Sequence, residues 1–195
     1  GTIAFAISGA IVAIEEEYSI LGVYTLGIVT AFGGGAVQNL FIGVPVNVFL
    51  EQELLFHTVL FVVTIVLLFS HSSLKHWHKW GNFMDAIGFA AFAIHGALYA
   101  VNMGHTTSTI IVAAVLAGSA GGIIRDVLGG RKPLILQTGM YACWAMLAGL
   151  IVSFKVIEHP IELYILFVGI VVFCALSYTY NWRLPNRILS SPSNE

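Results

Sequence analysis

The chain has 195 residues, of which 58% are hydrophobic and 9% charged, and its mean hydropathy is +0.90. A soluble domain carries about 25% charged residues, so this composition excludes an ordinary soluble enzyme and a disordered protein. The 8 Lys and Arg against 10 Asp and Glu provide no basic surface for nucleic acid. The long apolar runs predict an all-α polytopic membrane protein, because a transmembrane barrel would show short alternating strands.

Seven apolar segments are candidates for membrane-spanning helices, for which about 20 residues are needed. In chain order they are predicted at 2–14, 20–42, 48–69, 83–103, 107–128, 134–154 and 161–180. The first is short by this rule. The connecting stretches are brief and carry most of the charged residues, as expected of a multi-pass protein.

Lys and Arg are distributed unevenly between the two sets of loops. One set holds Lys75, Lys79, Arg131, Lys132, Arg183 and Arg187. The opposite set holds only Lys155. The positive-inside rule therefore predicts that the amino end lies outside and the carboxyl-terminal tail lies in the cytoplasm.

Comparison of the chain with itself shows an internal repeat at an offset of 87 positions. Residues 4–10 match 91–97, Gly34-Gly35 match Gly121-Gly122, and Gln38-Asn39 align with Arg125-Asp126. Because each copy holds three spans, the second copy is expected to be inverted in the membrane. Inverted repeats place a solute pathway at their interface, near the bilayer midplane. We expect a first three-helix repeat at 1–82, an inverted second repeat at 83–158, a seventh helix at 159–182 and a cytoplasmic tail at 183–195.

Glycine clusters occur in the second and fifth spans, at Gly33, Gly34 and Gly35 and at Gly121 and Gly122. Glycine costs about 1 kcal/mol relative to alanine inside a helix, so a kink or an unwound turn is expected at each cluster. Backbone groups freed by such a turn survive only when they face protein or a wet cavity, where carbonyls can coordinate a cation. The alternative is that the glycines let two helices pack closely without any break.

Arg125 and Asp126 are charges inside a predicted span, and such charges usually face a cavity or each other. Neighbouring side chains on a helix diverge by about 100°, so each is expected to find another partner. Gln38, Asn39 and carbonyls freed by a glycine break are the candidates. The alternative is that Arg125 extends to the interface and Asp126 caps a backbone group.

Ser8 and His95 occupy equivalent positions of the repeat, each beside a glycine, and are expected to face the interface between the copies. An intramembrane histidine is more often a hydrogen-bonded packing residue than a ligand. Further candidates for a polar lining are Thr30, Ser119, Thr138 and Tyr141. We find no motif for a nucleotide, a metal or a catalytic nucleophile, so no enzyme activity, cofactor or metal site is expected.

These motifs resemble one known family. Residues 4–10, 30–35 and 121–128 with the following Pro133, together with Arg183-Leu184-Pro185, are similar to the bacterial trimeric intracellular cation (TRIC) channel family. Its bacterial members also form a family of membrane proteins with a domain labelled "glycine transporter". The resemblance covers nearly the whole chain.

The resemblance implies seven spans, a homotrimer in the bacterial inner membrane and one pore in each subunit. It implies permeation by monovalent cations, chiefly potassium, between the second and fifth helices, with K⁺ or Na⁺ and membrane lipid as the other partners. Carried over by motif, the kinks fall at Gly33, Gly34, Gly35, Gly121 and Gly122. The lining or gating groups are Ser8, Gln38, Asn39, Arg125 and Asp126.

One departure from the family concerns the first repeat, which carries Gln38-Asn39 where members often carry Arg-Asp. This leaves one acid close to one base, so we expect the fixed charge nearly to cancel and selection among monovalent cations to be weak. Two functions remain open: a passive cation channel, and a secondary transporter of a small zwitterion such as glycine. Half-helix amino ends and freed carbonyls could serve either.

Overall fold

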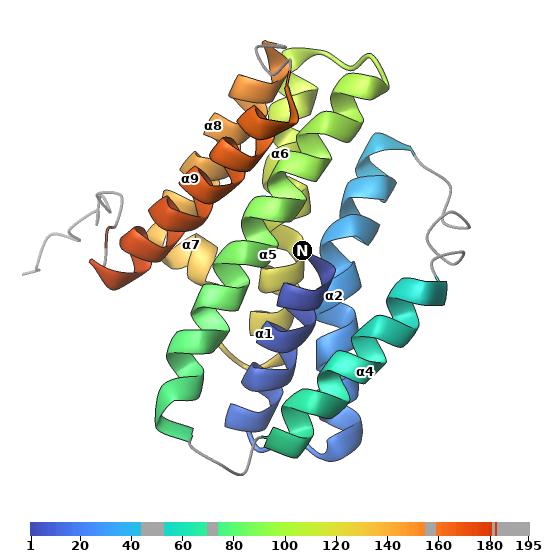
Figure 1. Ribbon diagram of the computed structural model, residues 1–195, viewed down its shortest axis with the longest axis vertical. Helices are drawn as coiled ribbons and strands as arrows, with labels where there is room; N and C mark the ends of the chain where they lie inside the picture. Colours follow the sequence, from blue (N-terminus) through green and yellow to red (C-terminus); the bar gives the residue numbers. More distant parts are fainter. Residues whose placement is uncertain (44–52, 70–73, 155–158, 181, 183–195) are drawn as a thin grey trace, which may run out of the picture.

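The computed structural model describes residues 1–43, 53–69, 74–154, 159–180 and 182, with the backbone alone at 74–78 and 138. Over this part of the chain all regular structure is helical. The helices in order are α1 (Thr2–Glu15), α2 (Ile20–Ile42), α4 (Glu53–Phe69), α5 (Leu74–Asn102), α6 (Thr107–Leu128), α7 (Leu134–Thr138), α8 (Met140–Ser153) and α9 (Pro160–Thr179). They form the bundle in Figure 1.

Four helices have the length and composition to cross a membrane. They are Ile20–Ile42, Lys79–Asn102, Thr107–Leu128 and Pro160–Thr179. The helices Thr2–Glu15, Glu53–Phe69 and Met140–Ser153 are apolar but shorter. The protein is therefore an α-helical membrane protein, as the composition predicts.

Two segment boundaries differ from the prediction. The stretch 74–82, expected as a loop with Lys75 and Lys79, continues α5 as helix. Polar residues show where a helix leaves the hydrocarbon layer, but they do not end the helix. A helix can continue through them because, unlike proline, they keep the backbone N–H. The predicted sixth span is split into α7 and α8 by Gly139, which adopts φ 68° in the left-handed region. That conformation suits glycine and closes a helix.

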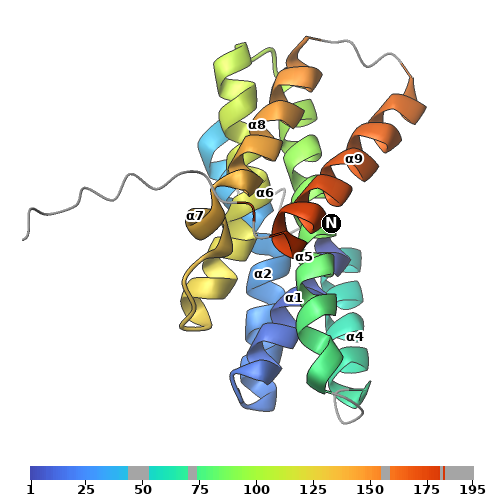
Figure 2. The ribbon, with the colours of Figure 1, turned by 90° about the vertical axis from the view of Figure 1, so that its left-hand side faces the viewer.

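Two groups of three helices make up the bundle. α1, α2 and α4 contact one another, and so do α5, α6 and α8. Across the groups, α1 contacts α5 and α2 contacts α6. In Figure 1 the members of each cross-pair run in opposite directions, with α1 descending beside the ascending α5. α9 packs on α5 and α8, and Figure 2 shows it inclined to the other helices.

The glycine clusters lie where α2 and α6 meet, and both helices are continuous through them. A Cβ on Gly34 would lie 2.5 Å from the backbone oxygen of Ala117, and one on Gly121 would lie 2.7 Å from the backbone oxygen of Thr30. The glycines thus allow two backbones to touch. The expected unwound turn is therefore wrong, since the missing side chains are used for packing; a bend of either helix axis stays a prediction.

Three hydrophobic cores form in the described part of the bundle. One packs Ile42 of α2 against α5, α6 and α8, and the other two hold more residues. Of these two, one contains Val23, Val59 and Val63 between α1, α2 and α4. The other contains Phe89 and Tyr141 between α5, α8 and α9, and it also receives Phe5 from α1. A side chain of the first group is thus inserted into the core of the second. Inside a membrane this contact stabilises the bundle by close packing, because lipid is as apolar as the core.

Candidate functional site

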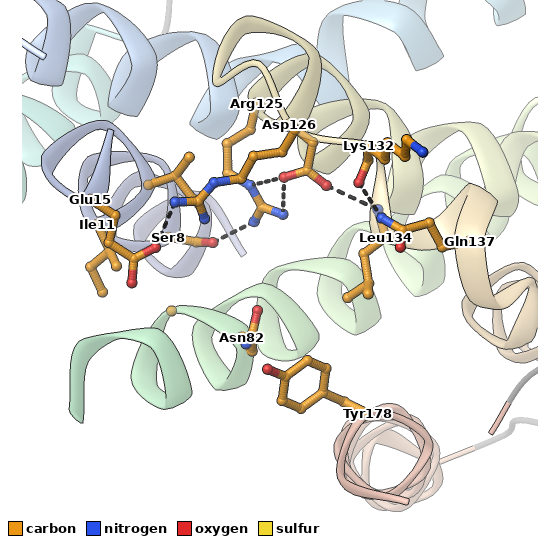
Figure 3. Close-up of a pocket in the computed structure, with 13 residues that line it drawn as sticks. Ser8, Ile11, Glu15, Asn82, Arg125, Asp126, Lys132, Leu134, Gln137 and Tyr178 are labelled. Atoms are coloured by element: carbon orange, nitrogen blue, oxygen red, sulfur yellow. Dashed lines mark hydrogen bonds and ion pairs between the residues drawn. The ribbon is translucent and has the colours of Figure 1, made fainter. Parts of the chain in front are cut away.

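Arg125, in the last turn of α6, is the centre of a buried polar cluster. Its side chain is nearly inaccessible, and it reaches groups on three helices. Nε donates a hydrogen bond to Oδ1 of Asp126 (2.8 Å), with Nη2 2.7 Å from the same oxygen. Nη1 donates to Ser8 of α1 and pairs with the carboxylate of Asp85 of α5. Figure 3 shows Ser8 and Asp126 converging on the guanidinium.

The contacts of Asp126 differ from those expected. We expected Arg125 and Asp126 to point apart, but the long arginine side chain bends back along the helix and binds its neighbour. The other oxygen of Asp126 accepts a hydrogen bond from the backbone nitrogen of Leu134 (3.1 Å), which ties the end of α6 to the first turn of α7. Gln38 and Asn39, the partners considered from sequence, lie in a different cavity.

Asp85 is the member of this cluster that the sequence analysis did not single out. It is 6% exposed and pairs directly with Arg125. The signal was available, because an acid at this position interrupts an otherwise apolar run and intramembrane acids are rare. With Asp85 included, two carboxylates face one guanidinium in this cluster, where the sequence analysis counted only Asp126.

A cavity of about 190 Å³ opens beside this cluster, and we call it the charged cavity. Its polar lining comprises Ser8, Glu15, Asn82, Arg125, Asp126, Arg131, Lys132, Gln137 and Tyr178. The amide nitrogen of Asn82 is buried there and has no hydrogen-bond partner among the described residues. It is therefore a donor available to water or solute in the cavity.

Arg131 closes one side of the charged cavity by joining the α6–α7 connection to the end of α1. It lies 2.9 Å from a carboxylate oxygen of Glu15 and 2.6 Å from one of Glu16. Burial alone would lower the pKa of Arg131, but its hydrogen bonds to Glu16 and Glu15 outweigh this and raise the pKa above its usual value. The guanidinium is therefore a permanent charge in this wall.

A second cavity of about 390 Å³ is bounded by α1, α2, α4 and α5, and we call it the amide cavity. Gln38, Asn39, His95 and Tyr99 provide polar groups beside an aromatic and aliphatic wall. Gln38 is only 1% exposed, and its amide nitrogen has no partner within the described part of the chain. His95 stacks on Tyr99 with ring centroids 6.1 Å apart.

The two cavities are lined by equivalent positions of the sequence repeat. Gln38, Asn39 and His95 of the amide cavity each lie 87 positions from Arg125, Asp126 and Ser8 of the charged cavity. One set is charged and the other carries no fixed charge. The same framework therefore presents two cavities of different polarity, each lined by helices of both three-helix groups.

Thr30 and Ser119, two further predicted lining residues, border neither of the two cavities, and Ser119 borders a smaller void beside Asp85. Thr30 is fully buried, and its hydroxyl donates to the carbonyl of Leu26 in its own helix (2.6 Å). Ser119 likewise donates to Val115 (2.5 Å). Such bonds satisfy a hydroxyl inside a helix without any solute.

Tyr141 and most of the predicted glycines lie outside the two larger cavities. Tyr141 borders a void of about 10 Å³ together with Asp85 and Gly122, and its hydroxyl has no partner among residues whose side chains are described. Gly35 lines the amide cavity, whereas the other predicted kink glycines are packing positions: Gly33, Gly34 and Gly121. Thr138 ends α7, and its side chain lies outside the described residues.

Comparison with known proteins agrees with this arrangement. A family model described as "Glycine transporter" matches residues 1–71 and 82–157. The "UPF0126 membrane protein YvgT" of Bacillus subtilis (strain 168) is 63% identical over 187 residues, which span 96% of this chain and 93% of that protein.

Solved structures extend the likeness to the fold. A prokaryotic TRIC channel crystallised in 0.5 M KCl has a TM-score of 0.87 at 30% identity and covers 94% of both chains. The TRIC trimeric intracellular cation channel orthologue from Rhodobacter sphaeroides has a TM-score of 0.82 at 30% identity, covering 93% of this chain and 94% of the other. On sequence and fold together, the chain belongs to the bacterial family of UPF0126 membrane proteins and prokaryotic TRIC channels.

Proposed function

We propose that the protein is a passive channel for monovalent cations, potassium among them, with one pathway inside each chain. The pathway links the charged cavity and the amide cavity through the region where α1 meets α5 and α2 meets α6. The observation that carries this proposal is the pair of cavities lined by equivalent positions in the two halves of the bundle. The likeness to TRIC cation channels supports it.

The chemistry of the two cavities suits a cation that keeps part of its hydration shell. In the charged cavity, the carboxylates of Glu15 and Asp126 can contact a hydrated cation, and the three basic side chains of the same lining keep it from binding tightly. In the amide cavity, the side-chain oxygens of Gln38 and Asn39 can replace water around the ion without binding it tightly. Conduction needs sites of this moderate strength.

Weak selection between potassium and sodium follows from the same lining. A strongly selective potassium filter uses rings of backbone carbonyls. Here α2 and α6 are continuous through their glycines, so their carbonyls stay engaged in the helices. We expect comparable permeability to both ions, and a large potassium preference in bilayer recordings would contradict this.

We extend the proposal to assembly and topology. The three-helix units at 1–82 and 83–158 form an inverted repeat, the seventh helix lies at 159–182, and the tail at 183–195 is cytoplasmic. The two ranges matched by the family model support this division. The chain forms a homotrimer in the bacterial inner membrane, supported by the trimeric relative. Its remaining apolar faces contact lipid, and its amino end lies outside.

A secondary transporter of glycine is the competing function, suggested by the name of the family model. A zwitterion needs a cationic and an anionic partner in one cavity. The charged cavity holds both kinds of group, but Arg125 and Arg131 there are each already paired with two carboxylates. No carboxylate lines the amide cavity among the described residues. The likeness to solved TRIC cation channels favours the channel.

Flux through purified protein in liposomes tests the proposal. Potassium should move down its gradient without saturation and without any effect of glycine. Asp126→Asn should lower this flux, while Glu53→Gln, whose carboxylate is 84% exposed on α4, should leave it unchanged. Saturable glycine uptake accelerated by internal glycine, without potassium flux, would overturn the channel and favour the transporter.

A further inference from the structure

A pair of stacked phenylalanines joins α1 and α5, and one of the two rings borders the amide cavity. Phe5 of α1 and Phe92 of α5 lie with ring centroids 5.2 Å apart and planes inclined by 13°. They are equivalent residues of the repeat, 87 positions apart. On α1, Thr2 borders the amide cavity and Ser8 borders the charged cavity, so Phe5 lies between the two along the helix.

Phe5 is held in place on every side. Its exposure is 0%, and glycines face its ring from two other helices. A Cβ on Gly121 of α6 would lie 2.9 Å from the ring, and a Cβ on Gly88 of α5 would overlap it. The ring occupies the space that these side chains would fill, so Phe5 has no room to change rotamer.

Phe92 has a different environment. It is only half-buried and forms part of the wall of the amide cavity, which offers about 390 Å³ beside it. The residue next to it on the cavity side, His95, is exposed. Phe92 can therefore swing away from Phe5 into free space, while its partner stays fixed.

We propose that the Phe5–Phe92 stack is the constriction that closes the pathway, with Phe5 as the fixed wall and Phe92 as the movable one. This inference rests on the proposed channel function. A narrow apolar passage excludes water and so blocks a hydrated ion without any plug. Movement of Phe92 into the amide cavity opens a wet connection to Ser8 and the charged cavity beyond it.

The test uses potassium flux and single-channel recording on wild type and Phe92→Ala, with tetramethylammonium as a second, larger probe ion. Removing the ring should raise potassium flux several-fold and should also admit tetramethylammonium. Phe92→Trp should reduce potassium flux. Phe173→Ala is the matched control, because Phe173 stacks on Trp144 of α8 with centroids 4.5 Å apart and borders neither cavity.

The outcomes separate the two proposals. If wild type conducts and folded Phe92→Ala shows wild-type flux and still excludes tetramethylammonium, the stack is not the constriction. If neither wild type nor any variant conducts potassium, the channel proposal itself fails. Should Phe92→Ala not fold, Phe92→Leu keeps an apolar side chain in place and must show the same direction of change in both ions.

Discussion

Asp85 on α5 and Arg125 on α6 form a buried ion pair between helices that follow each other in the chain. Both side chains are almost completely shielded, and Ser8 and Asp126 supply the remaining partners of the guanidinium. The pair therefore holds α1, α5 and α6 together at the wall of the charged cavity. Its contribution to the unfolding free energy of the protein can therefore be measured.

Replacing Asp85 by Ala should destabilise the protein by about 3–5 kcal/mol, because one partner of a buried pair is removed. A triple variant, Asp85→Leu with Arg125→Met and Asp126→Asn, should recover much of this loss, since it leaves no uncompensated charge in the cluster. Thermal unfolding in detergent, compared with Glu53→Gln, measures both effects. A triple variant as unstable as the single one would show that the ion pair is not the source of the loss.

Arg131 forms a similar ion-pair cluster at a more exposed place. It also pairs with two carboxylates, but its side chain is 28% exposed. Solvent screens such pairs, so Arg131→Gln should cost only about 0–1 kcal/mol in unfolding free energy. The same thermal assay applies, in low and in high salt. A loss as large as that of Asp85→Ala would mean that Arg131 has a structural role the geometry does not explain.

Gly34→Ala should destabilise the contact between α2 and α6 by about 1–3 kcal/mol and alter potassium flux, because the added Cβ meets backbone that cannot move aside. Gly169→Ala on α9 is the control, since a Cβ added there would have no neighbour within 4 Å among the described residues. That change should be neutral or stabilising by up to about 1 kcal/mol. Equal effects at both positions would contradict a role for Gly34 in close packing.

Asn39→Asp should raise cation conductance through the amide cavity, because it places a fixed negative charge where the described lining residues carry none. The gain should shrink as KCl is raised, since salt screens a charge within about 10 Å at 0.1 M. Asn39→Lys should have the opposite effect. Bilayer conductance at low and high KCl is the measurement, and identical currents in both variants would place Asn39 outside the pathway.

The primary sequence alone determined the class of the protein and singled out some of the residues that line its cavities. In a membrane, the backbone hydrogen bonds of a long apolar segment are satisfied within a helix. The repeat at an offset of 87 positions also paired Ser8 with His95 and Gln38 with Arg125. These are local or periodic properties, so they are visible without coordinates.

Only the tertiary structure decided which residues meet. Hydropathy marked where α5 leaves the apolar region but not that it begins at Leu74, and composition did not reveal that Gly139 ends α7. A glycine such as Gly34 can break its own helix or let a second helix pack closely. Here the second occurs, because Gly34 faces the backbone of Ala117 on α6. The pairing of Asp85 with Arg125 and the stacking of Phe5 on Phe92 depend likewise on packing between helices distant in sequence, because a side chain's partner is set by the three-dimensional arrangement and not by its neighbours in the chain.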